Sequence, residues 1–263
     1  MGALLFFDID GTLITLDSLH EFPESTKKAL LEAKKNGHKI FINTGRVKTA
    51  IDRKLLEFPF DGFVCGCGTY IEYEGKTLFH TQIEKGLCET YAKQIHEWNL
   101  GTVYEGKNQL FIDGDHGAGS FLEFIYDYFG HNSNMPIENY THPALIYDKF
   151  TTSKLPGSDM DSFMECFGKE FHLIPHGEAV VEAVPLGCSK ATGIEFLQKH
   201  LKADKEECYA FGDSINDMEM LQYVPHPVSM GNGVKEVKAV AEYITSDVDD
   251  DGIANALKYY GLI

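Results

Sequence analysis

The feature that most constrains the fold is a short apolar run that ends in two acids. Residues 3 to 7 are apolar at every position, and Asp8 and Asp10 follow directly. A strand that is apolar on both faces is typical of a parallel sheet covered by helices on both sides. The acids would then lie at the carboxyl end of the strand, where open α/β sheets bind their ligands. The start of the chain therefore predicts a buried parallel strand that leads into a ligand-binding edge.

The first and last portions of the chain alternate strand patterns with helix patterns. In the first portion, we expect strands at 3–7, 39–43 and 63–65, and helices at 26–36 and 47–58. After residue 188, we expect strands at 208–211, 227–230 and 243–245, and helices at 189–200, 217–222, 234–241 and 252–260. This alternation predicts an α/β fold with a doubly wound, mostly parallel, Rossmann-like core sheet.

The middle of the chain has a different pattern. Residues 70–81 alternate around Glu74-Gly75, which predicts a hairpin. Beyond it, we expect a helix at 84–98 and strands at 102–104, 109–112, 145–147, 171–174 and 180–183. The sequence therefore predicts a core made of residues 1–81 and 188–263, with an α+β cap domain inserted at 82–187.

Composition and charge indicate a globular protein and argue against nucleic-acid and membrane partners. Of the 263 residues, 43% are hydrophobic and 24% charged, as in globular proteins. The formal net charge of −17 repels a phosphate backbone, so we expect no nucleic-acid partner. No segment approaches the roughly 20 apolar residues of a transmembrane helix, so we expect no membrane partner.

The cysteines and the first residues bear on the cellular compartment. The chain has six cysteines but is long enough to fold without disulfides, which favours reduced thiols. The apolar run at 3–7 is too short for the core of a signal peptide. We therefore expect a cytoplasmic protein.

The first of four polar motifs is Asp8-Ile9-Asp10-Gly11-Thr12. Two carboxylates this close repel each other, and a hard divalent cation such as Mg²⁺ relieves that repulsion. Gly11 allows the backbone to turn sharply and present N–H groups to an anion. The alternative is an ordinary Asp-Gly turn without a ligand.

Two further motifs offer groups that suit an anion. Thr44, Gly45 and Arg46 follow the predicted strand at 39–43 and precede a predicted helix, whose N-terminus could bind phosphate. Lys190 follows Ser189, a candidate N-cap, although the helix dipole disfavours a lysine in the first turn. The alternatives are a simple helix cap, an arginine paired with an acid and a solvated surface lysine.

The fourth motif resembles the first. The segment 212–217 (Gly-Asp-Ser-Ile-Asn-Asp) places Asp213 and Asp217 after the predicted strand at 208–211. Acids from two strand ends could together complete a metal site, although a turn rich in Asp and Asn is the alternative.

In this order, the four motifs resemble those of the haloacid dehalogenase superfamily of phosphohydrolases. The segment 230–235 (Met-Gly-Asn-Gly-Val-Lys), with Asp251-Gly252, is similar to its Cof-type branch. Asp10 and Thr44 are 34 positions apart, whereas Thr44 and Lys190 are 146 apart. The large insertion therefore lies between the second and third motifs, which resembles the type IIB cap of that superfamily.

The resemblance implies a role for each motif residue. Asp8 would be the nucleophile that forms an aspartyl-phosphate, and Asp10 the general acid and base. Mg²⁺ would be held by Asp8, the backbone carbonyl of Asp10, Asp213 and Asp217. The residues expected to bind phosphate or substrate are Gly11, Thr12, Thr44, Gly45, Arg46, Lys190 and Asn216.

The resemblance also implies the activity. We expect a magnesium-dependent phosphatase for small phosphorylated metabolites, such as sugar phosphates or pyridoxal phosphate. The alternatives are a phosphotransferase or phosphomutase that uses the same intermediate, and a non-catalytic binding protein on the same fold. The sequence does not identify the oligomeric state.

Overall fold

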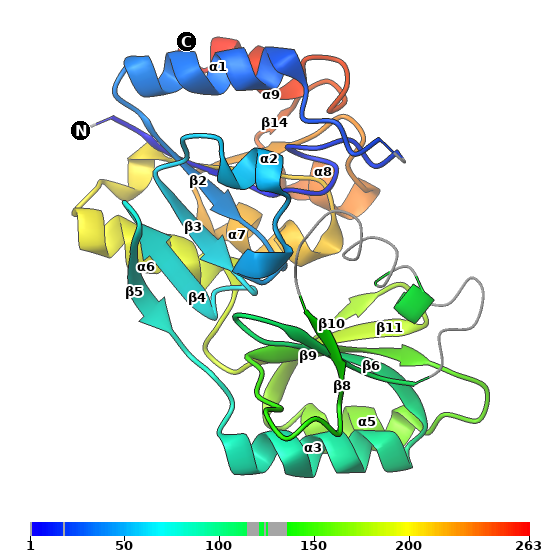
Figure 1. The fold of residues 1–263 in the computed structure, drawn as a ribbon. Coiled ribbons are helices and arrows are strands. Elements are labelled where there is room, and N and C mark those ends of the chain that lie inside the picture. Colours follow the sequence, from blue (N-terminus) through cyan, green and yellow to red (C-terminus); the bar gives the residue numbers. More distant parts are fainter. Residues whose placement is uncertain (1, 18, 115–120, 124, 126–135) are drawn as a thin grey trace. The chain divides into compact units, whose positions relative to one another are not determined.

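The computed structural model describes residues 2–17, 19–114, 121–123, 125 and 136–263, and divides the chain into two units (Figure 1). Unit 1 comprises Met1–Gly45, Lys54–Leu78 and Ser189–Ile263. Unit 2 comprises Arg46–Arg53 and Phe79–Cys188. The predicted boundaries lie at 81/82 and 187/188, with residues 46–53 in the core, whereas the structure groups that segment with unit 2.

Unit 1 is built on an eight-stranded sheet in the order β14-β13-β12-β1-β2-β3-β4-β5. Its strands are β1 (Leu4–Phe7), β2 (Lys39–Asn43), β3 (Gly62–Cys65), β4 (Tyr70–Tyr73), β5 (Lys76–His80), β12 (Cys208–Gly212), β13 (His226–Ser229) and β14 (Tyr243–Ile244). Neighbouring strands from β14 to β3 are parallel, and β4 is antiparallel to β3. The predicted doubly wound, mostly parallel sheet is confirmed.

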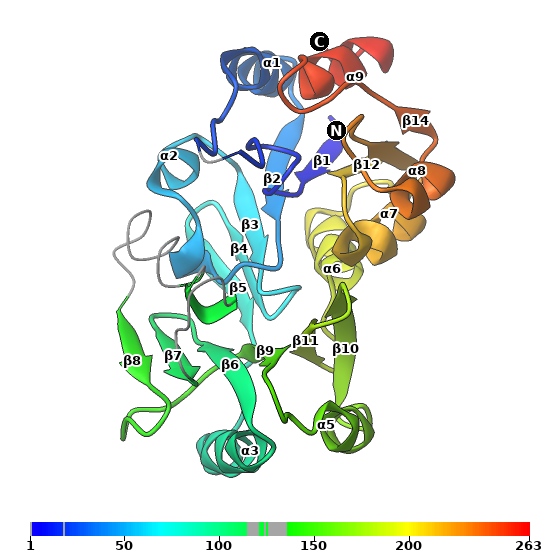
Figure 2. The same ribbon diagram turned by 90° about the vertical axis from the view of Figure 1, so that its right-hand side faces the viewer.

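The helices of unit 1 cover this sheet. They are α1 (Glu24–Lys35), α2 (Arg53–Leu56), α6 (Lys190–Leu201), α7 (Met218–Tyr223), α8 (Lys235–Val240) and α9 (Gly252–Tyr259), with short 3₁₀ turns at Lys205–Glu207 and Ile215–Asp217. Helices α1 and α9 lie side by side, away from α6, α7 and α8 (Figures 1 and 2). Within the described part of the chain, we find no helix with the length and apolar character needed to cross a membrane.

The central strand β1 is buried at all four positions, as the apolar run predicts. Leu4 and Phe6 pack in one core cluster with Ile194 and Leu197 of α6. Because successive side chains of a strand point to opposite faces, Leu5 and Phe7 need cover on the other face. Each such buried side chain contributes about 1.5–3 kcal/mol, so a polar substitution here would destabilise the sheet.

The strand order reverses at β1, and this reversal positions the site. The residues opposite Phe7 are Ile42 in β2 and Phe211 in β12, and all three strands run in the same direction. The residues that follow these strands therefore share one edge of the sheet, at the switch point where α/β proteins bind ligands.

The predicted helix at 47–58 was wrong. The structure has a 3₁₀ turn at Lys48–Ala50 and then the short helix α2. Ile51 interrupts the pattern because its backbone is extended, with φ −81° and ψ 134°. Three β-branched residues, at 47, 49 and 51, lower the helix propensity of this segment.

Unit 2 contains a six-stranded sheet in the order β10-β11-β9-β6-β7-β8. Its strands are β6 (Leu100–Glu105), β7 (Leu110–Asp113), β8 (Ile137–Asn139), β9 (Lys149–Lys154), β10 (Phe171–His176) and β11 (Val180–Pro185), and its helices include α3 (Lys85–Glu97) and α5 (Met160–Phe167). The predicted mixture of helices and strands is confirmed. The predicted strand at 145–147 was wrong, because the chain forms β9 a few residues later.

The two faces of the sheet in unit 2 differ in chemistry. One face packs Tyr104 and Phe150 against Phe163 and Phe167 of α5 in an aromatic core. Since side chains alternate along a strand, the neighbours of Tyr104 and Phe150 point to the other face. There Glu105 and Lys149 form an ion pair of 2.6 Å.

Candidate active site

Three buried carboxylates meet at the edge of the unit 1 sheet. Asp8 directly follows β1, and Asp213 and Asp217 follow β12. The three side chains can each offer an oxygen atom within 4.8 Å of the others. They are at most 5% exposed, although they come from opposite ends of the chain. The structure thus brings together the acids of the first and fourth motifs.

The loop after β1 makes close contact with Asp213. Gly11 has φ +74°, and a Cβ atom there would lie 2.4 Å from Oδ2 of Asp213. Thr12 donates its hydroxyl to Oδ1 of Asp213 at 3.3 Å. Gly11 is therefore needed for its backbone conformation and for the close approach of Asp213. Asp10 is partly exposed, and its charge reaches Asp8, whose pKa it raises.

The loop after β12 is organised by Asp217. Its Oδ2 accepts hydrogen bonds from the backbone N–H groups of Asp213 (2.9 Å) and Ser214 (3.0 Å). A Cβ atom on Gly212 would lie 2.6 Å from the Asp217 carboxylate. Asn216 accepts a hydrogen bond from the hydroxyl of Ser214 at 2.8 Å. These contacts fix the position of Asp213 from within its own loop.

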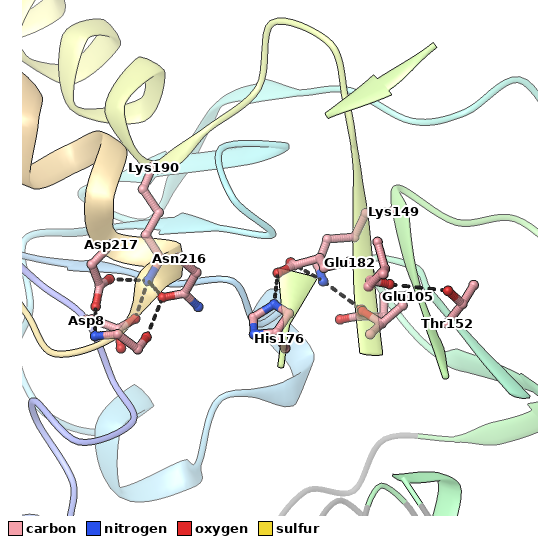
Figure 3. A network of polar contacts seen from close by, with 12 residues as sticks. Asp8, Glu105, Lys149, Thr152, His176, Glu182, Lys190, Asn216 and Asp217 are labelled. Atoms are coloured by element: carbon pink, nitrogen blue, oxygen red, sulfur yellow. Dashed lines mark hydrogen bonds and ion pairs between the residues drawn. The ribbon is translucent and has the colours of Figure 1, made fainter. Parts of the chain in front are cut away.

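Lys190 is the cation of the cluster, and it is 1% exposed. Its Nζ lies 2.6 Å from Oδ1 of Asp8 and 2.6 Å from Oδ1 of Asp217 (Figure 3). A third hydrogen bond of 3.3 Å reaches Oδ1 of Asn216. The predicted N-cap is confirmed, because the Ser189 side chain accepts a hydrogen bond from the backbone of Thr192 at the start of α6.

The pKa shifts follow from burial and charge. Burial and the charge of Asp217 raise the pKa of Asp8 to about 7, although Lys190 opposes the shift. Burial and the charges of Asp8 and Asp217 raise the pKa of Asp213 to about 8. Burial alone would lower the pKa of Lys190, but Asp217 and Asp8 outweigh it and raise this pKa above its usual value.

This donor set suits a divalent cation. Three ionised carboxylates and one ammonium carry a net charge of −2, and carboxylate oxygens are the ligands that hard cations prefer. Burial and negative charge that one lysine does not offset together raise the pKa values of Asp8 and Asp213. The residues therefore fit a divalent metal ion.

The second motif divides between the two units. Thr44 directly follows β2 and is 1% exposed, and its backbone carbonyl accepts a hydrogen bond from the backbone N–H of Cys67. Thr44 and Gly45 belong to unit 1, and Arg46 belongs to unit 2. No helix begins at Arg46, whose guanidinium lies 3.5 Å from the buried carboxylate of Asp52. Phosphate binding by Arg46 stays a prediction.

Two asparagines organise the site, although the sequence motifs that contain them gave neither a role. Asn43, the last residue of β2, donates to the backbone carbonyl of Lys190 at 3.0 Å and so anchors the start of α6. Asn232 donates to the backbone carbonyl of Gly11 at 2.8 Å. Because these partners are 147 and 221 positions away, no local pattern could identify them.

Comparison with known proteins defines the class. Residues 5–257 match the sequence profile of the haloacid dehalogenase-like hydrolases. The chain therefore belongs to this family.

Individual relatives indicate which hydrolase activity the chain has, because they are named phosphatases. The chain is 31% identical to YkrA of Bacillus subtilis (strain 168), which is provisionally named a phosphatase, over 100% of this chain and 99% of that protein. It is 28% identical to the HMP-PP phosphatase of Klebsiella pneumoniae (strain 342), over 91% and 88% of the two chains. The structure matches the subclass IIB sugar phosphatase BT4131 with a TM-score of 0.83, at 27% identity over 99% and 100% of the two chains. The protein is thus a phosphoric monoester hydrolase of the haloacid dehalogenase superfamily.

Proposed function

We propose that this phosphatase is magnesium-dependent and hydrolyses small phosphorylated metabolites through an aspartyl-phosphate on Asp8. The observation that carries the proposal is the cluster in which Lys190 lies 2.6 Å from both Asp8 and Asp217, beside Asp213. A carboxylate held between a cation and a candidate metal site is placed to become a nucleophile.

In the first step, an Asp8 oxygen attacks phosphorus while the bond from phosphorus to the leaving oxygen breaks. Asp10 gives its proton to that leaving oxygen, since it lies two residues after Asp8 in the same loop. In the second step, Asp10 takes a proton from water, which attacks phosphorus and breaks the bond to Asp8. Inorganic phosphate leaves, and both acids return to their starting states.

The remaining residues hold the phosphoryl group and the cation. Lys190 and Thr44 would bind the phosphoryl oxygens, with backbone N–H groups of the Gly11 loop. Mg²⁺ would be held by Asp8, Asp213 and the backbone carbonyl of Asp10, with Asp217 in support. When bound, it supplies positive charge that offsets the repulsion between Asp8 and the phosphate.

Small phosphate monoesters are the proposed substrates, with sugar phosphates first because one structural neighbour is a sugar phosphatase. Pyridoxal phosphate is a second candidate monoester. HMP-PP, which is a diphosphate and not a monoester, is added to the panel because several relatives are named HMP-PP phosphatases. We propose that the enzyme works in the cytoplasm, where its six free thiols would stay reduced.

Phosphate release tests the proposal. The purified enzyme, stripped of metal, is assayed on a chromogenic phosphate ester and on this panel, with and without Mg²⁺. We expect turnover only with Mg²⁺, and none from Asp8→Asn. The matched control Asp249→Asn changes an exposed aspartate of unit 1 and should keep full activity.

Several outcomes would contradict the proposal. Activity that survives in excess chelator would exclude the metal dependence, and an active Asp8→Asn enzyme would exclude the nucleophile. Transfer of phosphate to an added sugar, without release of free phosphate, would instead identify a phosphotransferase or mutase.

A further inference from the structure

The loop at Met230–Val234 joins the two acidic loops of the site. On one side, the backbone N–H of Val234 donates to the backbone carbonyl of Asp213 at 2.8 Å. On the other side, the Asn232 amide donates to the backbone carbonyl of Gly11 at 2.8 Å. This loop therefore contacts both the loop that follows β1 and the loop that follows β12.

The side chain of Asn232 is itself held by a second hydrogen bond. Its Oδ1 accepts a hydrogen bond from the backbone N–H of Val248 at 2.9 Å, so the orientation of the amide is fixed. The preceding residue, Gly231, donates its N–H to the carbonyl of Ser246 at 3.0 Å. The Asn232 side chain is thus a bridge between the segment 246–248 and the loop that carries Asp8 and Asp10.

The glycines on both sides of Asn232 show how closely this loop is packed. A Cβ atom on Gly231 would lie 2.4 Å from the carboxylate of Asp247. A Cβ atom on Gly233 would lie 2.7 Å from the hydroxyl of Ser229 and 3.3 Å from Cα of Asp213. Because this packing leaves the loop little room to move, the hydrogen bond from Asn232 holds Gly11 in a fixed position.

The position of Gly11 bears directly on the spacing of the carboxylates. Gly11 lies so close to Asp213 that an added Cβ atom would meet Oδ2 at 2.4 Å. Thr12, the next residue, also bonds to Asp213. A small displacement of Gly11 therefore changes the distance between Asp213 and the acids that precede Gly11.

We propose that Asn232 is a positioning residue that sets the spacing of the metal-binding carboxylates through the Gly11 carbonyl. The proposal rests on the proposed function, because it assumes that these carboxylates hold Mg²⁺. Asn232 acts through Gly11 and Asp213, and we assign it no contact with substrate. Groups that orient metal ligands typically change metal affinity by about 10–100-fold when they are removed.

Asn255 offers a matched control in the same unit. Its amide donates to the hydroxyl of Ser246 at 2.8 Å, so it tethers the same C-terminal segment without contact to Gly11. Asn255→Leu and Asn232→Leu each replace one asparagine by an apolar residue of similar size. A general loosening of the 246–250 segment should affect both variants equally.

Calorimetric titration of metal-free enzyme with Mg²⁺ tests the proposal. We expect Asn232→Leu to bind Mg²⁺ about 10–100-fold more weakly than wild type, and Asn255→Leu to bind it as wild type does. In the assay, Asn232→Leu should need more Mg²⁺ for half-maximal activity but regain most of its kcat at saturating Mg²⁺. If Asn232→Leu fails to fold, Asn232→Ser takes its place, because the serine side chain is too short to reach the Gly11 carbonyl and adds no apolar group.

The outcomes separate this proposal from the one on which it rests. Wild-type enzyme that binds no Mg²⁺ would overturn both. Wild-type binding with unchanged affinity in the Asn232 variants, or an equal loss in Asn255→Leu, would overturn the positioning role alone.

Discussion

At the residue scale, Lys190 is a buried cation shared by two carboxylates. Both ion pairs are 2.6 Å long, and neither partner side chain is more than 4% exposed. A buried charge whose partner is removed costs far more than the pair contributes, because the remaining charge stays desolvated. Lys190 therefore matters for stability as well as for the proposed binding of phosphate.

We predict that Lys190→Met lowers the free energy of unfolding of unit 1 by about 3–5 kcal/mol in the presence of chelator. Mg²⁺ should restore part of this loss, because a cation offsets the three acids that remain. Chemical denaturation followed by circular dichroism, with and without Mg²⁺, measures both effects. Lys199→Met is the control, because Lys199 lies on the same helix in an exposed pair with Glu195 and should change stability little.

Gly11 and Gly75 form a second matched pair, because both have φ +74°. Alanine in this conformation costs about 1–2 kcal/mol, which is the loss of stability that we predict for Gly75→Ala. Gly11→Ala should lose more, because its Cβ atom would also lie 2.4 Å from Oδ2 of Asp213. Only Gly11→Ala should also weaken Mg²⁺ binding, since nothing lies within 4 Å of a Cβ atom on Gly75. Equal Mg²⁺ affinity in the two variants would show that the contact with Asp213 has no role in the site.

The sequence predicted some of these residues and not others for a physical reason. Asp8 and Asp213 directly follow apolar strands, so the local pattern and the rule for parallel sheets place them together. Asn232 lies in the segment 230–235 that resembles the Cof-type branch, but its role depends on a hydrogen bond to Gly11 that only the folded chain creates. Contacts between loops that are distant in sequence leave no periodicity to find.

At the element scale, β9 shows why unit 2 was harder to predict. Lys149–Lys154 has the sequence Lys-Phe-Thr-Thr-Ser-Lys, which contains one large apolar residue. Lys149 is buried through polar pairing, because it lies 2.6 Å from Glu105 and 2.8 Å from Glu182 on neighbouring strands (Figure 3). A hydrophobic pattern identifies strands that bury apolar side chains, and therefore does not find this one.

Glu182 makes the stability of unit 2 depend on pH. Burial would raise its pKa, but Lys149 and His176 outweigh burial and lower the pKa below the usual 4.5. The ionised form therefore stabilises the fold fully above about pH 4.5, and this contribution is lost as the pH falls through the lower folded-state pKa.

We predict that Glu182→Gln is less stable than wild type near pH 6, and that the difference shrinks steadily as the pH falls below 4.5. Urea denaturation at several pH values, followed by the fluorescence of Trp98, measures it. Glu178→Gln, a change at an exposed glutamate before β11, should keep the pH dependence of wild type. A constant difference between Glu182→Gln and wild type at every pH would contradict the assigned ionisation.

At the scale of the whole molecule, each unit has a core of its own. The α6-facing cluster of unit 1 includes Leu4, Phe6 and Ile194, and the aromatic cluster of unit 2 includes Phe150 and Phe163. From the strand–helix alternation at both ends of the chain and its absence in the middle, the sequence predicts a core domain with an inserted cap domain. It did not predict that Arg46–Arg53 groups with unit 2, because the break at Ile51 is a matter of backbone conformation.

Trp98, the single tryptophan of the chain, allows the two cores to be followed separately. It lies in unit 2, with ring centroids 6.5 Å from Phe163 and 6.0 Å from Phe167. Its fluorescence therefore reports the core of unit 2, whereas far-ultraviolet circular dichroism reports both units. Because each unit buries its own apolar residues, we predict two unfolding transitions, of which fluorescence detects one.

Mg²⁺ should separate these transitions further, since its proposed ligands all belong to unit 1. A ligand at 100 times its Kd stabilises the folded state that binds it by about 2.7 kcal/mol. We therefore expect saturating Mg²⁺ to raise the transition seen by circular dichroism alone and to leave the Trp98 transition unchanged. An equal shift in both signals would mean that the two cores unfold as one cooperative unit, and binding at the carboxylates would then stabilise residues of unit 2 that contact no metal.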